Sequence, residues 1–496
     1  MNPITKLSCP PYSMNTPRFF LALAILTAAS SSHALTAGMV TTTADSGAGS
    51  LRAAISAAVI GVPETITFAP ALNGATITLT SGELVITELQ LSIDASALSR
   101  PIKISGNNSS HIFTISNNAS VSLNSLEILD GRNLVSNGGG IIAAQSHLDF
   151  INITIRGCVS NFEGGGLWAN NVTGTLDRCS ILGNDSQTFG GGISLIGSTS
   201  PTLKNTVITG NRGVVGGGIA IFLANPVLAN CTIQGNSGTG IQFELSATPT
   251  LRNTIVWGNR SGDGSISSQQ VRKGNSSTAS ANVDYCLVEG APATFNNLDG
   301  TLPANNPKFI SPANPVSSTT PPTVSADLRV FIDSSVINVG NNGSNSTPLD
   351  RAGKTRIQNT TIDLGAFEGS YVTFTFLHPT LTPTGDANGN GLSNFLEYAT
   401  GIDPTAPDDS SVQPQISTSG GFRFLTSSQR SNAADTTAVW QTSTNLSSNS
   451  WQEMLLGINY TVESTSNPAP SRQQVVMKLL DAGNRCFYRQ SFPNGN

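Results

Sequence analysis

The chain has 496 residues and carries few charges: Lys and Arg number 25, Asp and Glu number 30, and together they make up 11% of the chain, against about 25% in an ordinary soluble domain. A net charge of −5 without a basic run argues against a nucleic-acid-binding protein, which needs Lys and Arg to displace counterions from phosphate. Scarce charge also disfavours a coiled coil, and with 38% apolar residues and 49 glycines the composition favours stacked β-structure over disorder.

Residues 1–34 are predicted to be a signal peptide. Arg18 precedes an apolar run over residues 19–29, and a short polar segment ends at Ala34, which is the order of regions in a secretory signal. The run is shorter than the about 20 residues that cross a bilayer as a helix. Met14 is the expected start of translation. We therefore expect an exported chain with no integral membrane segment once the signal is removed.

The segment from Ser50 to Gly61 is predicted to be an amphipathic helix. Ser50 is a suitable N-cap and Gly61 a suitable end. We expect this helix to cover the first coil of the repeat that follows, because an open strand edge invites aggregation.

An internal repeat of about 26 residues dominates the region that follows. Three-glycine clusters begin at residues 138, 164, 190 and 216, each 26 residues after the last. A second series of glycines, each ending a short apolar run, keeps the same phase. Its members are Gly106, Gly131, Gly157, Gly183, Gly210, Gly235, Gly258 and Gly290. A period of this length with short β-rich runs predicts a parallel β-helix over residues 35–310, a rod on the order of 40 Å long.

The repeat predicts two columns of stacked side chains. The first lies four positions before the landmark glycines and holds Ile153, Cys179, Thr206, Cys231, Thr254 and Cys286. Cysteines two coils apart are separated by about 9 to 10 Å, too far for a disulfide, so we expect free buried thiols. The second column is an amide ladder directly after the glycines. Its expected members are Asn107, Asn184, Asn211, Asn236 and Asn259.

The sequence resembles two kinds of bacterial surface protein. The stretch TTTADSGAGSLRAAI and the repeated GGGI/L and TI-x-GN motifs resemble right-handed parallel β-helix repeat proteins of the polymorphic outer-membrane-protein type, over residues 41 to about 290. SSVINVG, PLDRAGKTR and IDLGAFE, within residues 311–370, resemble a choice-of-anchor module, which we expect to cap the C-terminal end of the rod. The resemblance implies an exported, cell-surface or outer-membrane-associated protein.

A linker over residues 371–384 leads to a predicted calcium loop and helix over residues 385–404. The string DANGNGLSNFLE fits the pattern D-x-[DN]-x-[DN]-G-x5-E. Side-chain oxygens would come from Asp386, Asn388, Asn390 and Glu397, a carbonyl oxygen would come from Leu392, and Gly391 permits the turn. The loop resembles a dockerin-like half-site that binds Ca²⁺, and the alternative is a plain Asn/Gly turn before a helix.

Residues 411–496 contain short alternating runs separated by Ser, Asn and Gly, which predict a small antiparallel β-sandwich with a sorting or anchoring role. Trp440, Trp451 and Tyr460 could stack on sugars, but core or edge positions are the favoured reading.

Evidence for an active site is thin in the sequence. The outward positions after the glycine clusters hold one acid, Glu244, in ten positions, and no spacing pairs His111, His147 or His378 with an acid. The same outward face carries Trp168, Ile196 and Phe222, which either bind a ligand or are covered by residues 290–330. Parallel β-helices also occur in polysaccharide lyases and hydrolases, but fold alone does not establish chemistry.

The sequence therefore predicts an all-β protein built on a right-handed parallel β-helix, with an N-terminal capping helix, a calcium loop and a small sandwich. Its expected role is that of a secreted or surface-displayed structural or adhesive protein, monomeric, that binds polysaccharide or cell-envelope components. The alternative is a carbohydrate-active enzyme of the pectate-lyase-like class.

Overall fold

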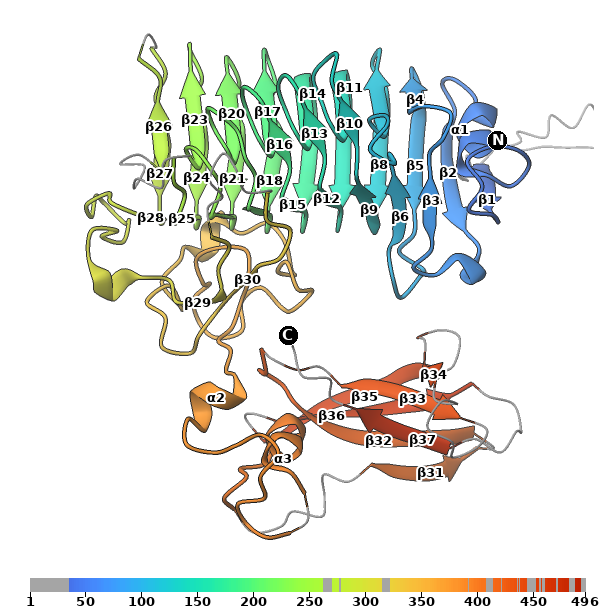
Figure 1. The fold of residues 1–496 in the computed structure, drawn as a ribbon, viewed down its shortest axis with the longest axis vertical. Helices are drawn as coiled ribbons and strands as arrows, with labels where there is room; N and C mark the ends of the chain where they lie inside the picture. Colours follow the sequence, from blue (N-terminus) through green and yellow to red (C-terminus); the bar gives the residue numbers. More distant parts are fainter. Residues whose placement is uncertain are drawn as a thin grey trace, which may run out of the picture. The chain divides into compact units, whose positions relative to one another are not determined.

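Parallel strands stack coil upon coil along a rod (Figure 1). The computed structural model describes residues 35–261, 270–275, 278–314, 322–390, 392–406, 414–420, 422–434, 436, 438–443, 452–454, 456, 460–469, 472–480 and 487–491. The predicted signal peptide, Gly391, Trp451 and Cys486 lie outside these residues. In the part that is described, no helix is long and apolar enough to cross a membrane.

Three sheets form the sides of the rod. The first runs in the spatial order β1 (Leu35–Val40), β2 (Pro63–Phe68), β5 (Gln90–Asp94), β8 (Ser120–Asn124), β11 (Ile141–Ile151), β14 (Leu167–Asp177), β17 (Ile193–Ile196), β20 (Ile219–Phe222), β23 (Ile241–Glu244) and β26 (Val271–Lys273). Its branches are β4 (Leu84–Thr87), β7 (Phe113–Ser116), β18 (Thr202–Lys204), β21 (Val227–Ala229), β24 (Thr250–Arg252) and β27 (Asn282–Asp284).

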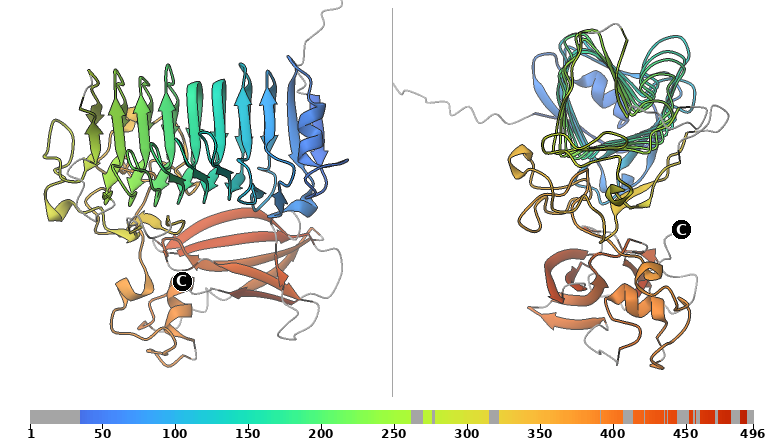
Figure 2. Two further views of the ribbon diagram at one scale, coloured as in Figure 1. Left: turned by 45° about the horizontal axis from the view of Figure 1, so that its top comes forward. Right: turned by 90° about the vertical axis from the view of Figure 1, so that its left-hand side faces the viewer.

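The second sheet holds the strands that precede the landmark glycines, together with β3 at its N-terminal edge. They are β3 (Thr76–Thr78), β6 (Ile102–Ser105), β9 (Leu126–Leu129), β12 (Thr154–Arg156), β15 (Ser180–Leu182), β19 (Val207–Thr209), β22 (Thr232–Gln234), β25 (Ile255–Trp257) and β28 (Leu287–Val288). A short third sheet consists of β10 (Arg132–Asn133), β13 (Val159–Ser160) and β16 (Asp185–Ser186). The view along the rod shows the coils lying over one another in register (Figure 2), as the two glycine series predicted.

The glycine clusters are required where backbones of successive coils touch. A Cβ atom on Gly165 would lie 2.4 Å from the carbonyl oxygen of Gly191, and one on Gly191 would lie 2.6 Å from that of Gly217. The first glycine of each cluster also has a positive φ, as in Gly164 (66°) and Gly190 (65°). Both conditions exclude a side chain, so the 26-residue period is a direct product of stacking.

Both predicted columns exist inside the rod. The backbone N–H of Cys179 donates to the Thr206 hydroxyl (3.4 Å) and that of Cys231 to the Thr254 hydroxyl (3.3 Å). Cys158, Cys179, Cys231 and Cys286 are free and buried, as predicted for the three in this column. Burial raises the pKa of each thiol to about 12, so all four are inert hydrophobic groups.

The amide ladder runs from Asn184 through Asn211 and Asn236 to Asn259. Each Nδ2 donates to the Oδ1 of the next asparagine at 2.8 to 2.9 Å, and all four residues are fully buried. Gln270 ends the ladder, accepting from Asn259 at 2.6 Å. The prediction that Asn107 belongs to it was wrong. Asn107 is exposed at a turn with φ 55°, because no asparagine follows the glycines of the two intervening coils.

The N-terminal helix is shorter than predicted. Helix α1 spans Leu51–Ala57, and the Ser50 hydroxyl accepts from the N–H of Ala53 as an N-cap. It ends at Ala58 rather than Gly61. Leu51 and Ile55 are buried in the same hydrophobic cluster as the strand residues of the rod, and Figure 1 shows α1 beside β1 and β2 at the N-terminal end.

Residues 309–370, here called the side module, lie along the flank of the rod. Their short elements are β29 (Phe309–Ser311), β30 (Asp327–Val330) and a 3-10 turn at Asn342–Ser344, preceded by another at Pro303–Asn305. Phe309, Leu328 and Leu364 pack with Val207 and Ile255, which point outward from the second sheet. The module therefore covers a side of the rod. The sequence had predicted that it caps the C-terminal end.

Polar contacts fix the side module on two successive coils. The Thr232 hydroxyl accepts from the N–H of Ala366 (2.9 Å), and Gln234 exchanges two hydrogen bonds with the backbone of Ala313 (2.9 and 3.0 Å). Asn253 donates to the carbonyl of Asn341 (3.0 Å) and accepts from its N–H (2.8 Å). These outward residues have no counterpart in the glycine pattern, so the sequence analysis missed them.

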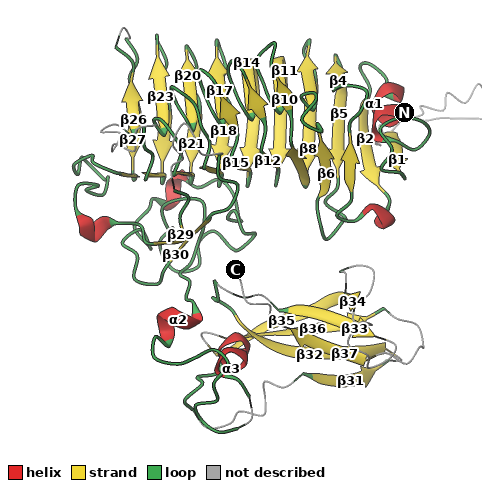
Figure 3. Cartoon of the chain, viewed as in Figure 1, coloured by secondary structure: helices red, strands yellow, loops and turns green. Residues whose placement is uncertain are grey.

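The C-terminal region combines two short helices with antiparallel strands (Figure 3). Helix α2 is Phe374–Leu377, and helix α3 is Asn394–Thr400 between its N-cap Ser393 and Gly401. The strands are β31 (Gln415–Ser419), β32 (Phe422–Arg430), β36 (Arg472–Leu479) and β35 (Tyr460–Ala469) in one sheet, with β34 (Gln452–Glu453), β33 (Val439–Ser443) and β37 (Phe487–Ser491) in the other. Trp440 is buried and Tyr460 packs against its cluster, as predicted for core residues.

The ladder should be a major contributor to stability. We expect Asn236→Ala to lower the free energy of unfolding by at least about 2 kcal/mol, because it leaves buried donors and acceptors on Asn211, Asn259 and Ile208 unpaired. Asn170→Ala, at a half-buried outward strand position, is the matched control and should cost less than about 1 kcal/mol. Urea unfolding followed by circular dichroism measures both. Equal losses of unfolding free energy in the two variants would show that the ladder stabilises the rod no more than an ordinary outward residue does.

Candidate functional site

A row of exposed side chains lies at a bend of the first sheet, within β11 and β14 and directly after β20 and β23. We call it the turn row. Its members share a left-handed backbone and are Asn118 (φ 62°), Gln145 (47°), Asn171 (54°), Leu223 (60°) and Leu245 (61°), with Gly197 (68°) between the polar and apolar parts. All are exposed except the half-buried Gly197. Asparagine tolerates this conformation, but leucine rarely adopts it, so the row is a local departure from ordinary turn chemistry.

The polar part of the turn row borders an open groove of about 520 Å³. Besides the three amide residues, the groove is lined by Ser146, His147, Thr173 and Ser198. The side-chain Oδ1 of Asn171 accepts from the backbone N–H of Ser198 (2.9 Å), which holds that amide in place. Every group lining the groove is an amide, a hydroxyl or an imidazole, and such groups hydrogen-bond to neutral polar ligands.

A histidine and an acid lie together beside this groove. His147 Nε2 lies 3.0 Å from Asp149 Oδ2, and its Nδ1 lies 3.0 Å from the Thr173 hydroxyl on the next coil. The prediction that no histidine is paired with an acid was therefore wrong for His147. His147 and Asp149 are two residues apart on β11, so both side chains point outward from the same face of the strand. A search for catalytic sequence motifs does not detect this spacing. Both side chains are nearly half exposed.

The face after the glycine clusters has the predicted register, but Ser194 and Ala220, predicted to point outward, are fully buried. Ile142, Trp168, Ser194 and Ala220 occupy matching positions on neighbouring strands. Trp168 is half-buried, and its indole N–H donates to Glu163 Oε2 (3.3 Å), which also accepts from the Ser194 hydroxyl (3.0 Å). Glu163 thus positions the indole ring of Trp168 through this hydrogen bond.

The alternative that residues 290–330 cover this face is wrong for the described part of that segment. Thr323 donates its N–H to the carbonyl of Gly210 (3.1 Å), and Ala313 pairs with Gln234, both at the second sheet. A loop of the rod itself covers part of the Trp168 face. Phe189 on this loop packs edge-on against Phe222, with 5.1 Å between the ring centroids.

The side module contains a buried cluster of four charges. Arg356, Asp350, Asp363 and Glu368 are all at most 1% exposed. Arg356 donates to the carbonyls of Asp363 (3.1 Å) and Gly365 (2.5 Å), and its Nε lies 3.9 Å from Glu368. The three carboxylates accept mainly backbone N–H groups, for example Asp350 from Lys354 and Glu368. The cluster therefore ties together loops that have almost no regular secondary structure.

Burial raises the pKa of Glu368 to about 7, with the Asp363 charge adding to the shift, and burial also raises the pKa of Asp350 and Asp363. Between pH 4.5, the ordinary value, and pH 7, the folded protein holds a proton that the unfolded chain has lost. Stability must then fall as pH rises through this window, and the full contribution is present only at the acid end.

We expect Glu368→Gln to flatten this dependence. The variant keeps the shape of the side chain but cannot ionise, so the difference in unfolding midpoint between pH 5 and pH 8 should be smaller than in the wild type. Thermal unfolding at several pH values measures it. An unchanged difference would show that Glu368 is not the titrating group.

The predicted calcium loop places three of its five expected ligands together. Glu397 is fully buried, and its Oε1 accepts from the Nδ2 groups of Asn388 and Asn390, both at 2.8 Å. Asp386 Oδ1 accepts from the N–H groups of Gly389 (2.8 Å) and Asn390 (3.2 Å), which folds the start of the loop. Leu392 donates its N–H to Asn390 Oδ1 (2.8 Å).

The oxygen atoms of these residues are of the kind that bind a hard cation such as Ca²⁺. Glu397 Oε2 is buried and has no hydrogen-bond partner among the described residues, which is costly for a carboxylate oxygen. The NH₂ groups of Asn388 and Asn390 donate to Oε1, and their amide oxygens accept the backbone N–H groups of Asn390 and Leu392. No cluster of three His, Cys, Asp or Glu residues suited to a metal exists in the described part of the chain, so any ion here would rely on amide and carbonyl oxygens.

Comparison with known families bears on the rod alone. Residues 102–284 match the family model described as a right-handed beta helix region. No curated protein matches the chain. The match and the coiled stack of parallel strands agree, so the chain contains a right-handed parallel β-helix built from sequence repeats.

Proposed function

We propose that this chain is an exported structural or adhesive β-helix protein that binds neutral polysaccharide along the groove beside the turn row. The observation that supports this function best is the groove of about 520 Å³ whose lining is hydroxyl, amide and imidazole, with Asn118, Gln145 and Asn171 at the same turn of successive coils. Coils repeat at about 4.8 Å, so equivalent amides are offered at regular intervals to a polymer whose hydroxyl groups also repeat.

The charge distribution favours a neutral polymer over an acidic one. His147 is the only titratable residue lining the groove within the described structure, and its imidazole already bonds to Asp149. An acidic polysaccharide would need Lys or Arg side chains for its carboxylates. Hydroxyl-rich chains are served by the exposed amides, which donate and accept at the same site.

Removal of two groove amides should weaken retention on polysaccharide. We expect the double variant Asn118→Gly/Gln145→Gly to bind neutral polymers such as xylan or glucomannan at least about tenfold more weakly in affinity electrophoresis, because each lost hydrogen bond contributes roughly 1 kcal/mol. Glycine keeps the left-handed turn free of strain. Leu245→Gly makes the same change at the same turn outside the groove and should bind like the wild type.

The same assay separates binding from catalysis. His147, Asp149 and Thr173 form a hydrogen-bonded row, and this is the observation that keeps the enzyme alternative in view. Reducing-end and unsaturated products are measured on the retained polymers. If the wild type forms products and His147→Ala does not, the protein is an enzyme and the binding proposal is wrong. If the wild type is retained on none of the neutral polymers, neither binding nor cleavage of these polymers is supported.

We also propose that the loop at residues 385–404 binds Ca²⁺ as a structural ion. Asp386, Asn388, Asn390 and Glu397 would supply side-chain oxygens and Leu392 a carbonyl oxygen. The buried, unpaired Oε2 of Glu397 supports this, and when bound the ion would neutralise that carboxylate. The Ala406 carbonyl, which accepts from Asn388 Nδ2 (2.7 Å), is an additional oxygen that the sequence did not predict.

Calcium should stabilise the C-terminal region with modest affinity. Two amides stand where acids are common in tight sites, so we expect a dissociation constant of about 10⁻⁴ to 10⁻³ M by calorimetry, as in extracellular modules. Glu397→Gln should lose the binding and the calcium-dependent rise in unfolding temperature. Glu463→Gln, in an exposed strand position, should keep both. Wild type protein without a calcium-dependent heat or temperature shift would overturn the site.

A further inference from the structure

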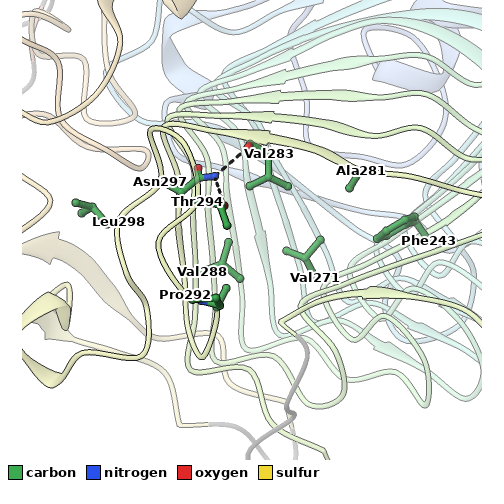
Figure 4. A pocket seen from close by; sticks show the side chains of 10 residues that line it. Phe243, Val271, Ala281, Val283, Val288, Pro292, Thr294, Asn297 and Leu298 are labelled. Atoms are coloured by element: carbon green, nitrogen blue, oxygen red, sulfur yellow. Dashed lines mark hydrogen bonds between the residues drawn. The ribbon is translucent and has the colours of Figure 1, made fainter.

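The last coil of the rod leaves an apolar opening at its C-terminal end (Figure 4). A cavity of about 370 Å³ is lined by Phe243, Val271, Val283, Val288, Leu298 and Ala281 among others. On the preceding coil the equivalent interior residues, Ile241, Leu251 and Val256, are fully buried. Their successors Val271, Val283 and Val288 are only half-buried, and among the described residues no complete coil lies over them. A terminal repeat normally carries a polar outer face for solubility, and this one does not.

The described part of the chain downstream of the opening does not supply the missing cover. After the loop at residues 291–298, which pairs with β28 through Leu287 and Leu298, the chain turns back along the flank. The side module makes its bonds to the rod at Gln234, Thr232 and Asn253, on earlier coils. Among the described residues, only the 291–298 loop lies against the opening, and the opening stays partly uncovered.

Phe295 projects beside the opening. Its side chain is fully exposed, at 101% of the reference area, and its φ is 52°. A bulky aromatic residue in the left-handed region is costly, and a fully exposed phenyl ring gains nothing from burial to offset that cost. Its neighbour Thr294 lines the cavity, as do Asn297 and Leu298. A projecting apolar side chain and an apolar hollow thus lie side by side on one end of the rod.

We propose that two copies of this chain associate through the C-terminal ends of their rods, with Phe295 of each copy inserted into the opening of the other. A surface that carries both a projection and a matching hollow is self-complementary about a twofold axis. The opening of about 370 Å³ is large enough for a phenyl ring. The sequence predicted a monomer, and this exposed end is the reason to expect otherwise.

Charges on the last coil agree with a twofold contact. Arg272 and Lys273 are exposed on β26, whereas Asp284 ends β27 and Asp299 follows the 291–298 loop, on other sides of the coil. A twofold axis placed between these two sides would bring the basic side of one copy opposite the acidic side of the other. Pairing β26 with β26 directly would oppose like charges, so the register is restricted to the arrangement that joins unlike sides.

The test is the oligomeric state of the chain from residue 35 to residue 496, measured by sedimentation velocity from 1 to 100 μM. Wild type should dimerise within this range, and Phe295→Asn should weaken dimerisation at least about tenfold, as expected when a buried aromatic anchor is removed. Asparagine suits the left-handed backbone, so folding should be unaffected. Leu223→Asn makes the matching change at an exposed left-handed leucine on another coil and should leave the dimer intact.

A second variant tests the geometry of the contact. Arg272→Glu/Lys273→Glu places acids opposite acids and should also weaken the dimer, more so at low salt than at high salt. Two outcomes overturn the proposal: a wild type that stays monomeric up to 100 μM, or a Phe295→Asn variant that dimerises as tightly as the wild type. Neither readout depends on polysaccharide or calcium, so it stands apart from the functions proposed above.

Discussion

Stacking of identical backbone shapes is the constraint on which the rest of the rod depends. Each coil satisfies the N–H and C=O groups of its strands only through the coils above and below it. Any residue that recurs at a stacked position must therefore tolerate its own copies at about 4.8 Å. Glycine does so at the clusters because there is no room for Cβ. Asparagine does so because its amide donates to the next amide along the ladder. Repeated buried charges would not, which accounts for the low charge content.

Periodic features could be predicted from the sequence because they are under this constraint. The register of the glycines determined the sheet order and the inward columns, including the free thiols of Cys179, Cys231 and Cys286. Where the period breaks, prediction failed. Asn107 was assigned to the ladder by its place after a glycine, but a ladder needs a partner on every coil, and the next two coils offer none. The end of α1 was placed by Gly61 alone, although Ala58 already donates to Ile55 and ends the helix.

The groove, the side module and the buried charge cluster lie outside what a repeat can predict. His147 and Asp149 meet because alternate residues of a strand share a face, and Thr173 joins them because it is the register partner of His147 on β14. Asn253 and Gln234 contact residues about 80 to 90 positions later, and no local pattern encodes such a pairing. The module covers outward apolar residues of the second sheet, Val207 and Ile255, which in the sequence look like any other strand positions.

The two ends and the flank of the rod show how one physical requirement is met in different ways. A solenoid satisfies its interior by repetition, so every place where repetition stops exposes apolar surface or an open edge. At the N-terminal end, α1 contributes Leu51 and Ile55 to the buried cluster. On the flank, where outward residues become apolar, the side module covers them. At the C-terminal end, Val271, Val283 and Val288 have no such cover in the described chain. The proposed association of two copies would bury this end, as α1 and the side module bury apolar residues elsewhere on the rod.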